Sequence, residues 1–326
     1  MAEITETPSQ NILDELALLR VQLDQEVPPK VLDKNLLIAT WNIRAFGNLT
    51  KKWDSEGDDS PRRDFRALLE ITEIVSRFHV VAIQEVRENI RALRYLLKLL
   101  GPHWGVILTD VTKGSQGNYE RLAFVFDTRV VQLSGLACEL VIPPEQLEKA
   151  AIQPDALSRQ FARTPYAVSF RAHDETFILV TMHAIYGDGT EERQKELKAI
   201  AEWLAEWAMD INAWDHNLIA LGDFNIDRKG DALFDAFTAT GLRAPAELDS
   251  APRTIFDTGS DTGHFYDQIA WFTGENNSPI LSMKFQNAGY FDFMQSTLKE
   301  LNLTKNALSW RISDHYPLWA EFSLRK

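Results

Sequence analysis

Apolar and polar residues alternate in two rhythms along this chain, and together the rhythms predict a mixed α/β protein. Apolar residues at helical spacing predict helices at residues 10–26, 65–74, 90–100, 191–211 and 232–239. Short apolar runs predict strands at residues 36–41, 80–83, 104–108, 122–126, 130–141, 166–170, 177–182, 218–226, 269–272, 280–285 and 318–322. We expect runs 122–126 and 130–141 to pair with each other, and helices to cover the sheets of one domain.

The stretch at residues 218–226, Leu-Ile-Ala-Leu-Gly-Asp-Phe-Asn-Ile, is central to the interpretation. Its apolar run closed by Gly222 is typical of a buried strand. Because side chains alternate along an extended chain, Asp223 and Asn225 should point to one side while Phe224 points back. A carboxylate beside an amide at the mouth of a strand suits a hard cation or a phosphate, although Asp and Asn also close ordinary turns.

Polar side chains capable of chemistry follow one predicted strand after another. They are Asn42, Glu85, His183, Asp223 with Asn225, Asp267, and Asp314 with His315. Each has an ordinary explanation when taken alone: a turn, a helix cap, a hydrogen-bonded core histidine or a loop acid. Because adjacent strand ends can converge in one cleft, their recurrence indicates a shared site.

The residue types in this set fit one class of reaction. Glu85 offers a carboxylate of the kind that binds Mg²⁺, an ion that keeps most of its waters. Two histidines can transfer protons near neutral pH, and nearby acids can orient them. Asn42 and Asn225 can hold a phosphate oxygen or an attacking water. Since the chain shows no Gly-rich phosphate loop and no evident Ser or Cys nucleophile, the pattern predicts metal-assisted phosphoester hydrolysis.

Composition and charge set limits on these expectations. The 326 residues are 45% apolar, with nine Trp and eighteen Phe, which is enough for a sizeable core. The net charge of −13 argues against a polybasic surface, yet a local basic cleft with a bound cation is compatible with DNA binding. The single Cys138 excludes an internal disulfide and a Cys-based zinc site. With no visible signal peptide or membrane-spanning run, we expect a cytoplasmic monomer without membrane association.

Several motifs resemble those of the endonuclease/exonuclease/phosphatase superfamily, and most nearly those of its deoxyribonuclease I branch. They are Ala39-Thr-Trp-Asn42-Ile-Arg-Ala-Phe-Gly47, Ile83-Gln-Glu85-Val-Arg87, Tyr119-Glu-Arg121, Phe161-Ala-Arg163-Thr-Pro165, His183, Gly222-Asp-Phe-Asn225, Tyr266-Asp267-Gln-Ile and Ile312-Ser-Asp-His-Tyr-Pro317. They occur in the family's order over about residues 36–326. The resemblance implies an α/β (α+β) fold, a four-layer α/β/β/α sandwich, with the site at one end of two packed sheets.

The resemblance also implies roles for individual residues. The expected catalytic residues are Glu120, His183, Asp223, Asn225, Asp267 and His315. The expected metal ligands are Asn42, Glu85 and Asp314, and the expected DNA contacts are Arg44, Arg87, Tyr119, Arg121 and Arg163. In this scheme His183 pairs with Glu120 and His315 pairs with Asp267.

Two segments have no counterpart in the family. Residues 1–34 are expected to be an N-terminal helical extension, and residues 143–160 an insertion that begins with a short helix. Residues 35–326 would then form the catalytic domain. We expect the helix at residues 10–26 to pack on the flank of that domain, because its apolar stripe is too short for a dimerising coil.

The expected protein is a Mg²⁺-dependent endonuclease that cuts DNA phosphodiester bonds with little sequence preference. Mn²⁺ is a second option for the catalytic ion, and Ca²⁺ an option for a structural one. His315 is the expected base and His183 the expected acid, although the sequence leaves this order open. Three alternatives also stay open: a phosphodiesterase or phosphatase acting on phospholipids or inositol phosphates, an abasic-site repair nuclease, and a binding protein that kept the fold without catalysis.

Overall fold

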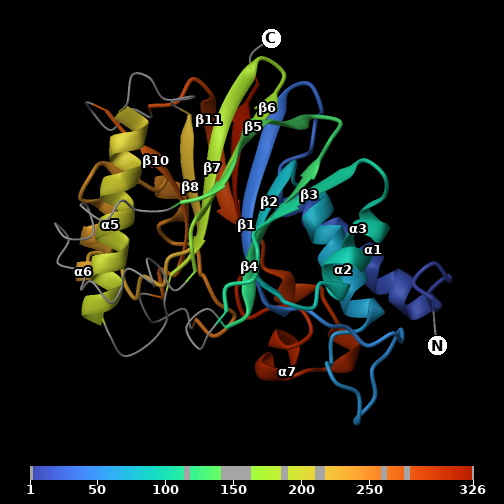
Figure 1. Cartoon of the computed structure of the whole chain (residues 1–326). Coiled ribbons are helices and arrows are strands. Elements are labelled where there is room, and N and C mark those ends of the chain that lie inside the picture. The colour runs from blue at the N-terminus through green and yellow to red at the C-terminus, as the bar shows by residue number, and fades with distance from the viewer. Residues whose placement is uncertain are drawn as a thin grey trace.

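Two six-stranded sheets pack face to face in the computed structural model, and helices cover both outer faces (Figure 1). The structure describes residues 3–113, 118–140, 163–184, 190–209, 217–257, 263–274 and 280–324. The first sheet has the order β11 (Lys284–Tyr290), β12 (Leu318–Ser323), β1 (Asn35–Phe46), β2 (Val80–Arg87), β4 (Glu120–Asp127) and β3 (Trp104–Leu108). The second has the order β5 (Val131–Glu139), β6 (Tyr166–Ala172), β7 (Glu175–His183), β8 (Leu218–Asp223), β10 (Asp267–Phe272) and β9 (Leu242–Arg243).

The helices divide between the two outer faces. The first sheet is covered by α1 (Gln10–Glu26), α2 (Phe65–Ser76) and α3 (Arg91–Leu100), and the second by α5 (Thr190–Met209) and α6 (Ala232–Thr238). Shorter turns lie in the connections: η2 (Ala246–Leu248), η4 (Phe293–Gln295), η5 (Lys299–Leu301) and α7 (Lys305–Ser309). None of the helices in the described ranges is long and apolar enough to cross a membrane.

Strand β1 shows why the sequence folds into four layers. Its alternate residues Leu37, Ala39 and Trp41 join the cluster beneath the helices, whereas Leu36 and Ile38 join the cluster between the sheets. Since successive side chains leave opposite faces of a strand, an almost continuous apolar run is needed where both faces are buried. The predicted α/β/β/α sandwich is thereby confirmed.

The predicted pairing of runs 122–126 and 130–141 is wrong. Strand β4 belongs to the first sheet, where β2 and β3 occupy its two edges, so neither edge is open to β5. The chain instead crosses to the second sheet, where β5 pairs with β6. The strand expected at residues 280–285 also starts later, at Lys284, and pairs with β12.

The N-terminal helix packs on the flank of the sandwich, as expected. Leu16, Leu19 and Leu23 of α1 are buried in the same cluster as α2 and the first sheet. Beneath them, Arg66 bonds Glu15 at 2.8 Å, and both side chains are buried. The boundary between an extension and a catalytic domain at residue 34 stays a prediction, and the insertion at residues 143–160 lies outside the described residues.

Candidate active site

The strand register brings the polar strand ends of the second sheet into one row. His183 on β7 is opposite Asp223 on β8, which in turn is opposite Asp267 on β10. Because β7 and β8 run parallel, both end at the same edge of the sheet. In the first sheet β1 and β2 are also parallel, and Asn42 is opposite Gln84, the neighbour of Glu85. The two sheets therefore present their polar ends to one another.

A cavity of about 470 Å³ lies where these ends meet. Nine predicted site residues line it: Asn42, Glu85, Glu120, Arg163, His183, Asp223, Asn225, Asp314 and His315. Asp267 lies behind this surface, fully buried, and contacts the cavity through His315. The predicted catalytic and metal-binding residues thus gather in one place, although they come from positions far apart in the chain.

Irregular backbone aims two of these side chains. Glu85 has a φ of 58° at a register shift between β2 and β4, and bulges of this kind turn a side chain away from the regular pleat. Gly222 has a φ of 141°, and a Cβ there would lie 2.2 Å from the carbonyl oxygen of Met182. Only glycine therefore lets β8 approach β7 closely enough to set Asp223 beside His183. Phe224 points back into the core, as predicted.

Hydrogen bonds tie the loop before β12 to the end of β1. The Ser313 hydroxyl donates to the Asn42 carbonyl oxygen at 2.6 Å and accepts from the backbone N–H groups of Arg44 and His315. The indole N–H of Trp41 donates to the carbonyl oxygen of His315 at 2.8 Å. These contacts fix the position of His315 relative to Asn42, although the two residues are far apart in the sequence.

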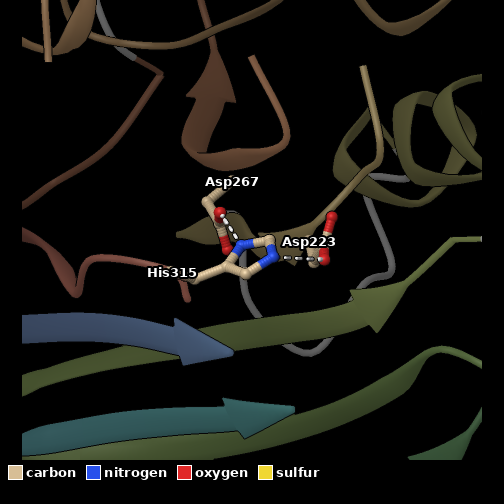
Figure 2. Close-up of side chains that lie close together, drawn as sticks. All are labelled: Asp223, Asp267 and His315. Carbon is tan, nitrogen blue, oxygen red and sulfur yellow. Dashed lines mark hydrogen bonds and ion pairs between the residues drawn. The ribbon is translucent and has the colours of Figure 1, made fainter. Parts of the chain in front are cut away.

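The imidazole of His315 lies between two buried carboxylates (Figure 2). Its Nδ1 is 2.6 Å from Asp267 Oδ2, and its Nε2 is 4.0 Å from Asp223 Oδ2. Burial alone would lower the pKa of His315, but the charge and hydrogen bond of Asp267, with help from Asp223, raise it well above the ordinary value. Burial raises the pKa of Asp267 to about 6, even though His315 opposes the shift.

The second pair, His183 with Glu120, has a different environment. His183 Nδ1 is 3.1 Å from Glu120 Oε2, and His183 Nε2 is 3.6 Å from Asp223 Oδ2. Glu120 also contacts Arg163 at 2.5 Å and Arg87 at 3.2 Å. Burial would raise the pKa of Glu120, but the hydrogen bond with His183 and the charges of His183 and both arginines lower it.

Asp223 is shared by the two histidines. The Nε2 atoms of His183 and His315 both approach the same oxygen, Oδ2, which also accepts a 2.9 Å hydrogen bond from Asn42. Its other oxygen accepts the backbone N–H of Asn225. Burial would raise the pKa of Asp223, but the charges of the two histidines and these hydrogen bonds lower it. A fully buried carboxylate is therefore kept ionised between two imidazoles.

Three oxygen-bearing side chains of the cavity fit a hard divalent cation. The Oδ1 atoms of Asn42 and Asp314 are buried and have no hydrogen-bond partner among the described residues. Both line the cavity together with the Glu85 carboxylate, and all three offer the oxygen ligands that Mg²⁺ prefers. Asp223, Asp267 and His315 also lie close enough together for an ion, but His315 Nδ1 is already bonded to Asp267 and Asp223 Oδ2 to Asn42.

The predicted DNA contacts differ in their distance from the cavity. Arg163 lines it, while Arg44 and Arg87 lie just outside and contact its acids, Asp314 at 3.3 Å and Glu85 at 3.3 Å. Tyr119 is half exposed and does not line the cavity. Arg121 follows Glu120 on β4, so its side chain leaves the other face and lies 3.9 Å from Asp110. Substrate contact by Tyr119 and Arg121 stays a prediction.

Five residues that line the cavity were not predicted as site residues: Asn118, Thr254, Phe256, His264 and Tyr266. Asn118 donates to Glu120 at 2.7 Å, and His264 stacks on Tyr266 with ring centroids 4.5 Å apart. Tyr266 precedes Asp267 in a motif already noted, which was the available signal. The other four lie in loops of ordinary polar and aromatic composition, where the sequence carries no periodic signal.

Comparison with known proteins gives one family for most of the chain. The model of the endonuclease/exonuclease/phosphatase family matches residues 39–280. A deoxyribonuclease from Thioalkalivibrio sp. (strain K90mix) is 26% identical over 304 residues, which cover 90% of this chain and 73% of that protein. Deoxyribonuclease-1 from Bos taurus is 24% identical over 295 residues, which cover 88% and 92%.

Solved structures share the fold at lower identity. An endonuclease/exonuclease/phosphatase family protein from Bacteroides thetaiotaomicron aligns with a TM-score of 0.59 and 17% identity, over 90% of this chain and 98% of that one. A mannosyl-6-phosphatase from B. thetaiotaomicron VPI-5482 aligns with a TM-score of 0.57 and 19% identity, over 89% and 100%. At these identities the alignments speak for the fold alone.

Proposed function

This chain belongs to the endonuclease/exonuclease/phosphatase family, and on that premise we propose that it is a divalent-metal-dependent endonuclease acting on DNA. The observation that carries the proposal is the arrangement around Asp223, where two histidines, each paired with its own buried carboxylate, face one oxygen at the wall of a cavity. Two proton-transfer groups on one reaction centre suit the hydrolysis of a phosphodiester by water.

The chain's own residues would divide the chemistry among them. Glu85, Asn42 and Asp314 would hold the cation, which would supply neutralising charge at the phosphate when bound. One histidine would take the proton of the attacking water and the other would give a proton to the leaving oxygen. Asp223 and Asn225 would hold the water and the scissile phosphate against them. Which histidine acts as base and which as acid stays open. The raised pKa of His315 favours its protonated form, and it can act as base only after losing that proton.

DNA is the favoured substrate for two reasons. Arg44, Arg87 and Arg163 lie at or beside the cavity, each paired with one of its acids, and arginine contacts to phosphates would position a duplex without reading its sequence. The two relatives reported above are both named deoxyribonucleases. We expect little sequence preference, since arginine contacts to phosphates carry no information about the bases.

A small phosphoester is the second candidate. The net charge of −13 repels a long polyanion outside the cavity, and one solved structure of this fold is a sugar phosphatase. Three substrates test the alternatives against undamaged DNA: sphingomyelin, inositol phosphates and a duplex with an abasic site. Turnover of any of them faster than plasmid DNA would replace the proposed substrate while leaving the proposed chemistry in place.

Plasmid nicking with Mg²⁺, Mn²⁺ and Ca²⁺ tests the proposal directly. We expect nicking that EDTA abolishes and that Glu85→Ala reduces by at least about 10²-fold, because the anchoring carboxylate of the ion is lost. Glu88→Ala, an exposed acid three residues further along, is the matched control and should retain wild-type activity. Nicking that persists in EDTA, or a Glu85→Ala protein as active as Glu88→Ala, would contradict the metal-dependent mechanism.

A further inference from the structure

A second cavity of about 470 Å³ lies apart from the catalytic one and is strongly basic. It is lined by Lys51, Asn89, Ile90, Arg91, Arg94, Tyr95 and Lys98, none of which lines the catalytic cavity. The four cations Lys51, Arg91, Arg94 and Lys98 are called the basic cleft below. Such a concentration of positive charge is unexpected on a chain with a net charge of −13.

The geometry of α3 places three of these cations on one side. Arg91, Arg94 and Lys98 are exposed and recur at helical spacing, whereas Leu93 and Leu96 between them are buried against the sheet. Helix α3 alone would present an ordinary solvated face. The loop between β1 and α2, drawn in blue below α2 in Figure 1, also lines the cavity, through Lys51.

The cations of the basic cleft have no acidic partners in the described part of the chain. No carboxylate there lies within 4.0 Å of Lys51, Arg91, Arg94 or Lys98. Arg91 donates to the side-chain oxygen of Asn48, and Lys51 lies 5.8 Å from the ring centre of Tyr95.

The acids in the neighbouring loop are engaged elsewhere. Asp54 bonds Arg66 at 3.0 Å and Asp59 bonds Lys52 at 2.9 Å. Four like charges around one concave surface repel one another, and an anion bound among them relieves that repulsion. The cleft therefore has the electrostatics of an anion site.

One short segment of the chain connects the basic cleft to the catalytic cavity. Arg87, which contacts Glu85 and Glu120, is four residues before Arg91. Gly47 packs against Arg87 on one side, and its carbonyl oxygen accepts the N–H of Ala92 on the other. Four residues span at most about 14 Å, which is roughly four nucleotides of one strand at 3.4 Å each.

We propose that the basic cleft is a phosphate-binding subsite that holds the backbone of the nucleic-acid substrate several nucleotides from the scissile bond. This inference rests on the proposed endonuclease function and adds a determinant of substrate length to it. A polynucleotide would engage both the catalytic cavity and the cleft, whereas a small phosphoester would reach only the cavity. The cleft thereby separates long substrates from short ones on an otherwise acidic surface.

The test measures DNA binding by fluorescence anisotropy in the Glu85→Ala background, with a duplex of about 20 base pairs and salt as the variable. Arg94→Glu/Lys98→Glu should weaken binding at least tenfold at low salt and reduce the salt slope by about 2, since each phosphate contact contributes about 0.9. Lys34→Glu/Arg171→Glu makes the same charge change on exposed residues and is the matched control. Lys51→Gln, in the loop between β1 and α2, should act in the same direction by about half as much.

Hydrolysis of bis(p-nitrophenyl) phosphate by the same variants, with Glu85 intact, measures the catalytic step without any contribution from the basic cleft. We expect rates within twofold of wild type, because this substrate reaches only the catalytic cavity. If the cleft and control variants lose equal DNA affinity, the subsite inference is overturned while the endonuclease proposal survives. If plasmid is not cut yet the cleft variant alone loses DNA affinity, the endonuclease proposal fails, and the cleft is then a binding site for the nucleic-acid backbone without a role in cleavage. Loss of binding to anionic phospholipid vesicles without loss of DNA binding would also overturn the inference.

Discussion

The two histidine–carboxylate pairs have the same components in opposite surroundings. Asp267 is fully buried beside His315, and burial raises its pKa to about 6. Glu120 is equally buried, but two arginines and Asn118 surround it and its pKa is lowered. The pKa of Asp267 depends mainly on burial, His315 and Asp223, with a smaller effect of the charge of Arg253, whereas Glu120 lies among His183 and two arginines that contact it directly.

The chemical role of a histidine–carboxylate pair depends on which other groups contact the carboxylate. A carboxylate with one partner strengthens the hold of that histidine on its proton. A carboxylate compensated by arginines mainly fixes the orientation of its histidine. The pKa of His315 is accordingly raised, and Glu120, together with Asp223, holds His183 in position.

Removing either histidine should have the largest effect. His315→Ala and His183→Ala are each expected to lower kcat by about 10²–10⁴-fold, because each removes one positioned proton transfer. Single-turnover cleavage of a labelled duplex measures the chemical step, and circular dichroism checks the fold. The double variant should be little worse than either single variant if the two act in one concerted reaction. A His183→Ala enzyme with near wild-type turnover would restrict the chemistry to the His315 pair.

Replacing the carboxylates should separate the two pairs. Asp267→Asn is expected to cost about 10²–10⁴-fold in kcat, since the amide no longer favours the correct tautomer of His315. Glu120→Gln should cost less, about tenfold to 10²-fold, because Asp223 still constrains His183. The kcat values for bis(p-nitrophenyl) phosphate compare the two without contributions from DNA binding. Equal losses would show that the environments do not differentiate the roles.

The pH dependence of folding stability, measured in EDTA, should show the smallest effects. The two pairs should change it in opposite directions. The folded pKa of His315 lies above its ordinary value near 6.5, so its contribution is present below that pH and lost as pH rises. Asp267 acts in the same direction because its pKa is raised: its contribution to stability is lost as the pH rises from about 4 to about 6. The lowered pKa of Glu120 contributes stability above about 4.3 that is lost as pH falls.

Thermal unfolding of the variants between about pH 2.5 and about pH 9 measures this difference, because the Glu120 contribution is lost only below about pH 4.3. Asp267→Asn should flatten the decline in melting temperature on the alkaline side, and Glu120→Gln should flatten the decline on the acid side, each by a few degrees. Arg171→Gln, an exposed change on β6, serves as the control for charge alone. Identical pH profiles for the two carboxylate variants would remove the electrostatic distinction between the pairs.

Much of the site was accessible from the sequence because its residues end apolar runs. Asn42, Glu85, His183 and Asp223 each follow an apolar run that is typical of a buried strand, and all of them line the cavity. The loop residues Thr254, Phe256 and His264 were missed, since a loop has no hydrophobic period to mark its direction. The β4–β5 pairing failed for a related reason: strand patterns reveal that a strand exists, and which edge it joins depends on the other strands.

The order of apolar and polar residues determined the layers of this protein and the kind of side chain at each strand end. Those properties are local, because alternation and helical spacing decide which face of an element is buried. Only the tertiary structure decided that Asp223 faces two histidines, that Glu120 is surrounded by arginines, and that Lys51 and α3 line one cavity. Such relations join residues far apart in the chain, and their energies depend on distance and burial that no local pattern encodes.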